Sequence, residues 1–157
     1  MTDSPDARQN PSAHSDGTTP PDLGGAESGT AGFGSASSAI DRTIEVIVPA
    51  RIEMAATLRL LCASLGADVG LSLDEIDDLR LAVSEVFASI ADLDSSSRVS
   101  VSFEPEDGCV GAMFFAIGPT PIALDELAAT ILRSAVDDLT IESGTVRFVK
   151  RSSESAS

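Results

Sequence analysis

The sequence predicts an α/β (α+β) fold: a two-layer sandwich in which a mixed, mostly antiparallel sheet carries its helices on one face. Two observations lead to this class. Between residues 43 and 151, β-rich segments and segments with helical apolar spacing follow one another in the order β-α-α-β-β-α-β-β. Short turns join the strands of the later pairs, which favours antiparallel neighbours and leaves the helices to cover one face.

Both ends of the chain differ in composition from this central part. Residues 1–42 are rich in Ser, Gly, Thr, Pro, Ala and Asp, and Ile40 is the first β-branched aliphatic residue. A segment with so little to bury cannot offset the entropy lost when its backbone is ordered. We therefore expect residues 1–42 to be disordered, residues 43–151 to form the folded domain, and residues 152–157 to be a second disordered end.

The folded part opens with a strand and a helix. Residues 43–49 are β-rich, with alternating aliphatic residues on one side, and a proline closes the run. A helix is predicted over residues 51–65, because apolar residues recur there at steps of three and four. Gly66 follows where a left-handed helix cap is common, so we expect the helix to end there.

The second helix has a clear start signal. In SLDE, the Ser72 hydroxyl can accept from the Glu75 amide while the Glu75 carboxylate reaches back, which is a capping box. The helix is predicted to begin near Leu73 and to run to about Asp92, with a continuous apolar side. Its opposite, polar side carries Asp78, Glu85 and Ser89.

The remaining elements are a hairpin, a helix and two strands. Residues 98–117 alternate as a hairpin around the turn at residues 105–108, and residues 122–136 have helical spacing. Two short strands flank Gly144. The aromatic residues expected in the core are Phe87, Phe103, Phe114 and Phe115.

Composition restricts the function classes. The chain carries 25 acidic and 10 basic residues, a formal net charge of -15, so nucleic acid and anionic membranes are disfavoured as direct partners. It has no apolar run of about 18 residues and no signal-peptide pattern, which favours the cytoplasm. Cys62 and Cys109 lie in apolar segments rather than in CxxC or Cys/His clusters, so we expect two buried thiols, no disulfide and no structural zinc.

The helix phrase DDLRLAVSEVFASI resembles the GHKL ATPase fold, and specifically the small anti-sigma factors that act as serine kinases in bacterial stress and sporulation switches. The resemblance covers about residues 43–151 and extends to TIEVIVPARIEMAATLRLL, to the hairpin that leads to AIGPTP, and to SGTVRFVKR. It implies binding of an alternative sigma factor, usually by a homodimer, and release by a competing anti-anti-sigma protein. Active members use ATP to phosphorylate that competitor on a serine.

The same resemblance assigns two positions on the second helix. Glu85 occupies the place of the glutamate that polarises the attacking hydroxyl, the ancestral catalytic position. Ser89 occupies the place of an asparagine that holds the magnesium ion. A neutral hydroxyl is a poorer magnesium ligand than an amide oxygen, and phosphoryl transfer depends on that ion.

The other nucleotide positions are altered as well. Ala116 replaces the aspartate that accepts the adenine amino group, Gly118 is retained, and Thr120 places a branched side chain where the family keeps glycine. The glycine-rich lid has no counterpart, and Gly144 with Thr145 is what remains of the late part of the site. Loss of the buried adenine acceptor alone costs about 1 to 3 kcal/mol. We therefore expect a vestigial nucleotide site with no cofactor, or with weak binding of ATP and magnesium.

The resemblance also suggests where partners bind. The first helix lies near the partner surface in this family, so Arg51, Glu53 and Arg59 are candidates for partner contact. The sequence thus predicts an anti-sigma factor that sequesters an alternative sigma factor. One alternative is an ATP-dependent serine/threonine kinase that acts on an anti-anti-sigma factor with Glu85 as its base. Another is a regulatory domain of this fold whose partner is not a sigma factor.

Overall fold

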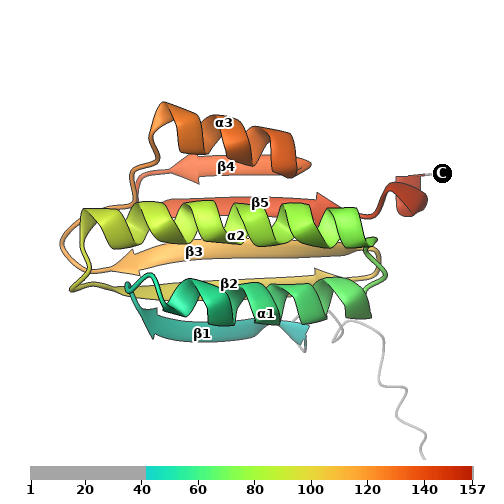
Figure 1. Cartoon of the computed structure of the whole chain (residues 1–157), viewed down its shortest axis with the longest axis horizontal. Coiled ribbons are helices and arrows are strands. Elements are labelled where there is room, and N and C mark those ends of the chain that lie inside the picture. The colour runs from blue at the N-terminus through green and yellow to red at the C-terminus, as the bar shows by residue number, and fades with distance from the viewer. Residues whose placement is uncertain (1–41, 157) are drawn as a thin grey trace, which may run out of the picture. The chain divides into compact units, whose positions relative to one another are not determined.

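A computed structural model describes residues 42–156 as a two-layer domain, with five strands in the order β1-β2-β3-β5-β4 and the helices on one face of the sheet (Figure 1). The expected disordered tail, apart from residue 42, and residue 157 lie outside the described residues. The elements are β1 (Ile44–Pro49), α1 (Met54–Asp68), α2 (Leu73–Leu93), β2 (Arg98–Glu106), β3 (Cys109–Ile117), α3 (Glu126–Ala135), β4 (Asp138–Glu142), β5 (Thr145–Arg151) and a 3-10 helix (Ser153–Ala156). The predicted fold class is confirmed.

The sheet is more regular than predicted, because every neighbouring pair of strands in the described domain is antiparallel. The predicted mixed sheet is therefore wrong in this respect. The reason lies in the helical hairpin between β1 and β2. Because α1 and α2 run in opposite directions, the chain re-enters the sheet at the end where β1 leaves it, and β2 must run back along β1 (Figure 1).

The first helix differs from its predicted bounds at both ends. It begins at Met54, so Arg51 and Glu53 precede it rather than lie on it. The helix also continues past Gly66, which is a buried residue within it. A Cβ at this position would lie 3.1 Å from the Ile76 side chain, so the close packing of α1 against α2 favours glycine here. The left-handed residue of this connection is Gly70, with a φ of 82°.

The second helix begins as predicted. The Ser72 side chain accepts from the Glu75 amide at 3.3 Å, and the Glu75 carboxylate accepts from the Ser72 amide at 2.7 Å. Both hydrogen bonds of the capping box are thus present. The apolar side of α2 is buried against the sheet and α1. No helix within residues 42–156 has both the length and the apolar character that a bilayer crossing requires.

The third helix begins later than predicted. Its first residue is Glu126, because the Asp125 side chain caps it by accepting from the Ala128 amide at 2.7 Å. The preceding segment is extended and buries Ile122 in the core. The side of α3 that faces the domain consists mostly of small residues, whereas Leu127 is 69% exposed.

One aromatic residue does not lie where the sequence suggested. Phe87, Phe103 and Phe114 are fully buried between the sheet and the helices, as predicted. Phe115 is 50% exposed, because side chains alternate along β3 and this one lies on the face that no described helix covers. The thiol of Cys109 belongs to the same face and is only partly buried, so the expectation of two buried cysteines holds for Cys62 alone.

The end of the chain is ordered beyond the predicted boundary. Ser152 is buried, and its amide donates to the Gly108 carbonyl at 2.7 Å. The Ser153 amide donates to the Glu75 carboxylate at 2.7 Å, and a 3-10 helix follows. The expected disordered end at residues 152–157 is therefore corrected as far as residue 156, because these backbone groups have partners in the folded domain.

Candidate functional site

Glu85 and Ser89 lie on one side of α2. They follow Asp78 by about two and about three helical turns, so all three side chains share one stripe of the helix. That stripe is turned toward α3 rather than toward open solvent, because Asp78 contacts a lysine that also binds the last turn of α3. Glu85 and Ser89 are both half-buried.

The hydroxyl of Ser89 is engaged within its own helix. It donates to the Glu85 carbonyl oxygen at 2.9 Å, one turn back along α2. This contact keeps the short side chain close to the helix backbone. An asparagine amide at the same place would extend further from the helix, so the serine is poorly suited to bridge a magnesium ion to a nucleotide.

Gly118 has a packing role in the domain. A Cβ at this position would overlap the Ser97 hydroxyl and would lie 3.1 Å from the Ser97 Cβ. Ser97 is held in place, since its hydroxyl donates to the Asp94 carboxylate at 2.6 Å and its carbonyl accepts from the Ala50 amide at 2.9 Å. Ser97, in the loop between α2 and β2, leaves no room for a side chain at residue 118. This contact explains the glycine without a ligand.

Ala116 cannot supply the adenine contact of the aspartate that it replaces. Ala116 is buried at 8% exposure in the core, opposite Val99 in the sheet, and its methyl group has no polar atom that could accept from adenine. Thr120 is half-buried in the loop that follows β3. The Ala116 side chain lacks an acceptor, so it cannot replace the hydrogen bond that fixes a purine base.

Gly144 and Thr145 belong to the tight turn between β4 and β5. Glu142 pairs with Thr145, so Ser143 and Gly144 form a two-residue loop in which the glycine has a φ of 84°. Because Val146 points into the core, Thr145 points to the opposite face of the sheet. The structure therefore separates Thr145 from Glu85, which lies in the helix layer.

The candidate partner residues lie before α1 and within its second turn. Arg51 and Glu53 form an exposed ion pair at 3.8 Å in the segment before the helix. Arg59 lies further along α1 and is half-buried. An exposed pair of this kind contributes little to stability, so both side chains are available for a partner.

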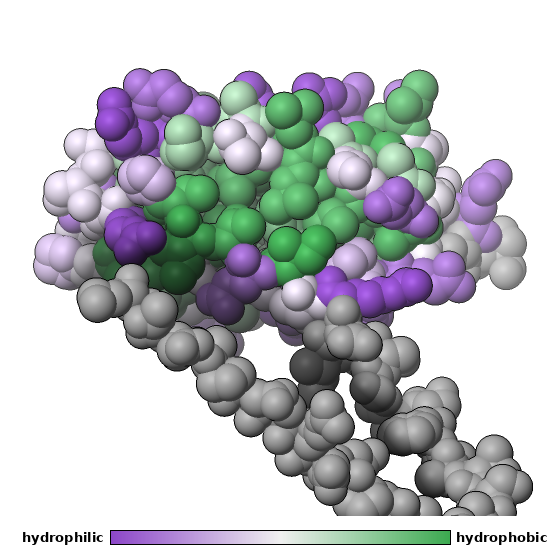
Figure 2. Space-filling model, turned by 90° about the horizontal axis from the view of Figure 1, so that it is seen from below, coloured by the Kyte–Doolittle hydropathy of each residue, from purple (hydrophilic) through white to green (hydrophobic). Residues whose placement is uncertain are grey.

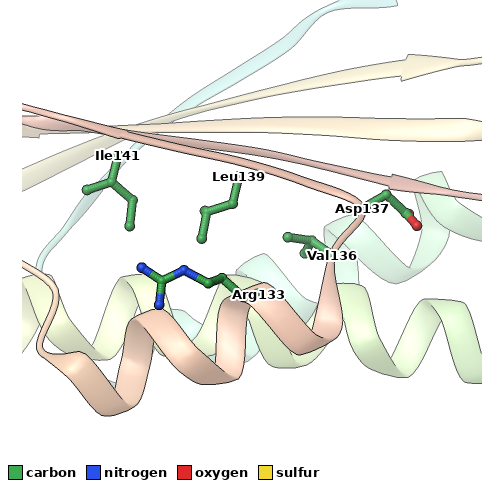
Figure 3. A pocket seen from close by; sticks show the side chains of 5 residues that line it. All are labelled: Arg133, Val136, Asp137, Leu139 and Ile141. Atoms are coloured by element: carbon green, nitrogen blue, oxygen red, sulfur yellow. The ribbon is translucent and has the colours of Figure 1, made fainter.

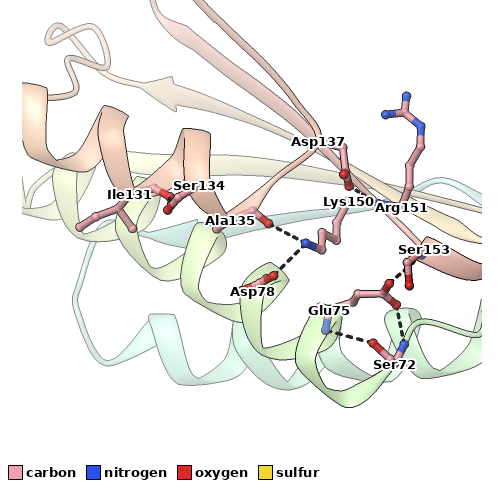
Figure 4. A network of polar contacts seen from close by, with 10 residues as sticks. All are labelled: Ser72, Glu75, Asp78, Ile131, Ser134, Ala135, Asp137, Lys150, Arg151 and Ser153. Atoms are coloured by element: carbon pink, nitrogen blue, oxygen red, sulfur yellow. Dashed lines mark hydrogen bonds and ion pairs between the residues drawn. The ribbon is translucent and has the colours of Figure 1, made fainter.

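A polar network that the sequence analysis missed joins α2, α3 and β5 (Figure 4). Lys150 Nζ donates to the Asp78 carboxylate at 2.8 Å and to the Ala135 carbonyl oxygen at 3.0 Å. The lysine side chain is 11% exposed, because it lies on the core side of β5. The available signal was its register: Lys150 continues the buried alternation of Val146 and Phe148.

Glu75 forms the other part of this network (Figure 4). One carboxylate oxygen accepts from the Ser153 amide and the other from the Ser72 amide, both at 2.7 Å. These backbone donors, that of Ser153 first, lower the pKa of Glu75 to about 2. The carboxylate thus fastens the end of the chain to the start of α2, which is a structural use of the charge.

Two cavities border these elements. A groove of 390 Å³ lies between α3 and β4 and is lined by Arg133, Val136, Asp137, Leu139 and Ile141 (Figure 3). A second hollow of 410 Å³ lies beside the polar network and includes Glu75, Cys109 and Lys150. Neither is lined by Glu85, Ser89 or Gly118. Within residues 42–156 there is also no group of three or more His, Cys, Asp or Glu side chains arranged to hold a metal ion.

The residues present do not fit ATP and magnesium. The Ser89 hydroxyl donates to the helix backbone, and the Ala116 side chain has no acceptor. The Ser97 side chain fills the space beside Gly118. Acidic residues also greatly outnumber the one base, Arg80, between residues 68 and 94, which repels a polyphosphate. We therefore derive no phosphoryl-transfer step for this chain.

No model of a known protein family matches the chain, and no curated protein matches it. Among solved structures it is similar to the RsbU and RsbW domains of Rv1364c from Mycobacterium tuberculosis, with 19% sequence identity and a TM-score of 0.49. The match covers 70% of this chain and 32% of that chain. The chain therefore spans about a third of the length of the structure that it resembles.

Proposed function

We propose that this protein is a binding protein of the GHKL type: an anti-sigma factor that sequesters an alternative sigma factor in the cytoplasm without a need for ATP. One observation carries the proposal. The positions that would hold the nucleotide are occupied by internal contacts of the domain, as with Ser89 on the Glu85 carbonyl and Ser97 against Gly118. The folded scaffold is complete without a ligand, which is what stoichiometric binding requires.

The charge of the chain supports a basic protein as the partner. At a formal net charge of -15 the protein attracts positive surfaces over a distance of about a Debye length. Sigma factors carry basic surfaces that face DNA, so the two potentials are complementary and accelerate encounter. The ion pair of Arg51 and Glu53, together with Arg59, supplies charged groups at the start of α1 for such a contact.

Partner switching follows from the same proposal. An anti-anti-sigma protein would compete for the protein and release the sigma factor, and the working unit would be a homodimer. Release by competition needs no chemistry at Glu85. It needs two partners that share part of one surface, and the exposed charges before α1 provide a candidate for that part.

Isothermal titration with Mg-ATP tests the absence of nucleotide use. We expect no binding at ATP concentrations up to about 1 mM and no transfer of phosphate to an anti-anti-sigma protein. The purified chain should nevertheless co-elute with one alternative sigma factor on gel filtration. Micromolar ATP binding, with phosphate transfer that Glu85→Gln abolishes and Glu142→Gln, at an exposed acid of β4, preserves, would overturn the proposal and establish the kinase.

The kinase remains the second candidate because of one observation. The Glu85 residue is half-buried, and among the described contacts its carboxylate has neither an ion pair nor a hydrogen bond, so it is free to act on a hydroxyl.

The third candidate is a regulatory domain whose partner is not a sigma factor. It predicts that a pull-down with the full chain recovers no sigma factor.

A further inference from the structure

The helix layer covers the β1 edge of the sheet incompletely. Ile44, Val46 and Val48 face the core side but are only half-buried, whereas their neighbours on β2 are fully buried. The cause is the position of α1, which packs over β2 and β3 rather than over β1. Figure 2 views the molecule from the β1 side and shows the apolar band that results between strand and helix. We name these three core-side residues of the strand the β1 wedge.

A hollow of 370 Å³ continues the β1 wedge at the start of the strand. One of its apolar walls is Ile44, and the others come from the end of α1, the loop after it and β2: Leu65, Val69 and Pro105. A hollow of this size has room for an apolar side chain from a segment that lies along the edge.

The backbone of β1 presents hydrogen-bonding groups at the same edge. The Ala50 amide donates to the Ser97 carbonyl at 2.9 Å, which marks these residues as a hydrogen-bonded pair of the ladder with β2. Bonded and non-bonded positions alternate along an antiparallel ladder, so the amide and carbonyl groups of Glu45 and Ile47 point away from β2. Pro49, which lacks an amide proton, falls in the same outward set, as this register requires. No described strand pairs with that side of β1.

The two edges of the sheet differ in how they resist a further strand. The strand β4 carries Asp138 and Glu142 at its two ends, and charges on an edge discourage pairing. The strand β1 has one charged residue, Glu45, and the rest of its run is aliphatic apart from the final proline. An apolar edge with unpaired amides is a template for another strand, so β1 is the edge of this sheet at which a strand can add.

We propose that β1 is a docking edge for an extended segment of another protein, which joins the sheet as an additional strand antiparallel to β1. The segment's residues opposite Glu45 and Ile47 exchange backbone hydrogen bonds with them, and their side chains lie on the face of the sheet without helices. The residues between these are apolar and face the β1 wedge, and one of them enters the hollow beside Ile44. The proposal concerns the edge alone, so it does not rest on the partner being a sigma factor.

Charge selects basic side chains for the other face of the segment. Glu45 is exposed, and its carboxylate accepts from the Ser100 hydroxyl at 2.9 Å. Within residues 42–156 this carboxylate has no ion pair. Arg42 and Asp68, which both line the hollow, balance each other, so Glu45 and the formal net charge of -15 decide the preferred sign. We therefore expect a lysine or arginine opposite Glu45, because complementary charges favour the contact.

The face of the sheet without helices is the competing surface for a partner. Phe115 is 50% exposed there, but Arg147 and Glu104 form an ion pair at 3.2 Å on the same face. A partner that covered this face would desolvate the pair, whereas a strand added at β1 leaves it in water.

The first test is isothermal titration of the full chain with a short synthetic peptide in which valine and lysine alternate. We expect a Kd between about 10 and 100 µM. N-methylation of the lysines removes the amides that donate to the Glu45 and Ile47 carbonyls, so binding should weaken at least about tenfold. N-methylation of the valines removes amides that point away from β1, and this peptide, matched in composition, should bind within about threefold of the parent.

The second test changes the protein. Ile47→Pro removes an outward amide and leaves the ladder with β2 intact, so the variant should melt cooperatively and bind the peptide at least about fivefold more weakly. Phe115→Ser, on the competing face, is its control and should bind like the wild type.

A charge exchange does not depend on how the proline variant folds. Glu45→Lys should weaken the valine–lysine peptide by about threefold to tenfold and strengthen a valine–glutamate peptide to a similar extent. Glu142→Lys makes the same change in net charge at the opposite edge and should alter neither affinity by more than about twofold.

Four results would each overturn the proposal. The first is no binding at about 1 mM peptide, and the second is equal affinity of the two methylated peptides. The third is loss of binding in Phe115→Ser with full binding in Ile47→Pro, which would place the peptide on the competing face. The fourth is a peptide affinity that falls as the protein self-associates, measured by sedimentation equilibrium, which would assign the edge to a second copy.

Discussion

At the scale of single residues, several side chains stabilise the domain at positions where the resemblance implies nucleotide contacts. Gly118 shows this well, because a Cβ there would overlap the Ser97 hydroxyl. Ser97 is itself fixed, since its hydroxyl donates to Asp94 and its carbonyl accepts from the Ala50 amide. A glycine retained for such a contact gives the same sequence signal as one retained for a ligand. The two reasons differ in which atoms a Cβ at the glycine would contact, and at Gly118 these atoms belong to Ser97.

Gly118→Ala separates these two explanations. The added methyl group would overlap the Ser97 hydroxyl, so we expect a loss of about 1 to 3 kcal/mol in the free energy of unfolding. Ser97→Gly removes the obstructing side chain, and in that background the alanine should cost much less. Urea unfolding of all four proteins measures the coupling. Additive effects would show that Gly118 is retained for another reason.

Glu75→Gln tests the carboxylate that holds the end of the chain. The folded pKa is about 2, below the ordinary 4.5, so the charge stabilises the fold above about pH 4.5 and this contribution is lost as the pH falls toward 2. We expect the variant to be about 1 to 2 kcal/mol less stable at pH 7 and nearly equal to the wild type near pH 2. Asp74→Asn, at an exposed acid of the same helical turn, is the control and should change stability by a few tenths of a kcal/mol at most. A gap between Glu75→Gln and the wild type that did not narrow in acid would contradict the assignment.

At the scale of elements, α3 is attached to the domain by few large side chains. Its inner side consists of Ala128, Ala129, Leu132 and Ala135. Lys150 compensates at the C-terminal end, since it donates to a carbonyl of the last turn and to Asp78 on α2. The helix that borders Glu85 is thus held by one polar contact at its end as well as by packing.

Lys150→Met removes that contact while the length of the side chain is kept. We expect a loss of about 1 to 2 kcal/mol and faster hydrogen exchange in α3, because the Ala135 carbonyl loses its donor. Arg147→Met is the matched control on the same strand, where the exposed pair with Glu104 should contribute less than about 1 kcal/mol. Equal losses in the two variants would refute a special role for Lys150.

At the scale of the whole molecule, charge sets what the protein can approach. A formal net charge of -15 on 157 residues gives a field that reaches basic surfaces before contact. The acidic residues of α2 are concentrated in its first two turns. The same field opposes a polyphosphate ligand, so the proposed binding of a basic partner and the proposed loss of ATP use would both follow from one property.

Association with a basic partner should therefore depend on salt. Between about 50 and 500 mM NaCl we expect the association rate with the proposed sigma-factor partner to fall by about tenfold, with a smaller change in the dissociation rate. Stopped-flow mixing measures both. A neutral osmolyte at equal osmolality is the control and should leave the rates unchanged. A rate independent of salt would show that charge does not guide this encounter.

The sequence by itself determined the order of elements, the start of α2 and most of the core. These follow from local signals, such as the Ser72 capping box and the alternation along β2. It did not determine the face on which Phe115 lies, because a strand with apolar residues on both sides carries no signal for its covered face. The observed bounds of α1 and α3 also differ from the predicted ones. Close packing carries α1 past Gly66, and the Asp125 side-chain cap sets the start of α3.

The tertiary structure decided what the candidate site residues do. Glu85 and Ser89 were correctly placed one turn apart, but only packing revealed that their side of α2 is turned toward α3. The contact of Gly118 with Ser97, the partners of Lys150 and the attachment of Ser153 to Glu75 join segments far apart in the chain. Local patterns specify helices and strands, whereas the surroundings of a side chain depend on which distant segments the fold brings beside it.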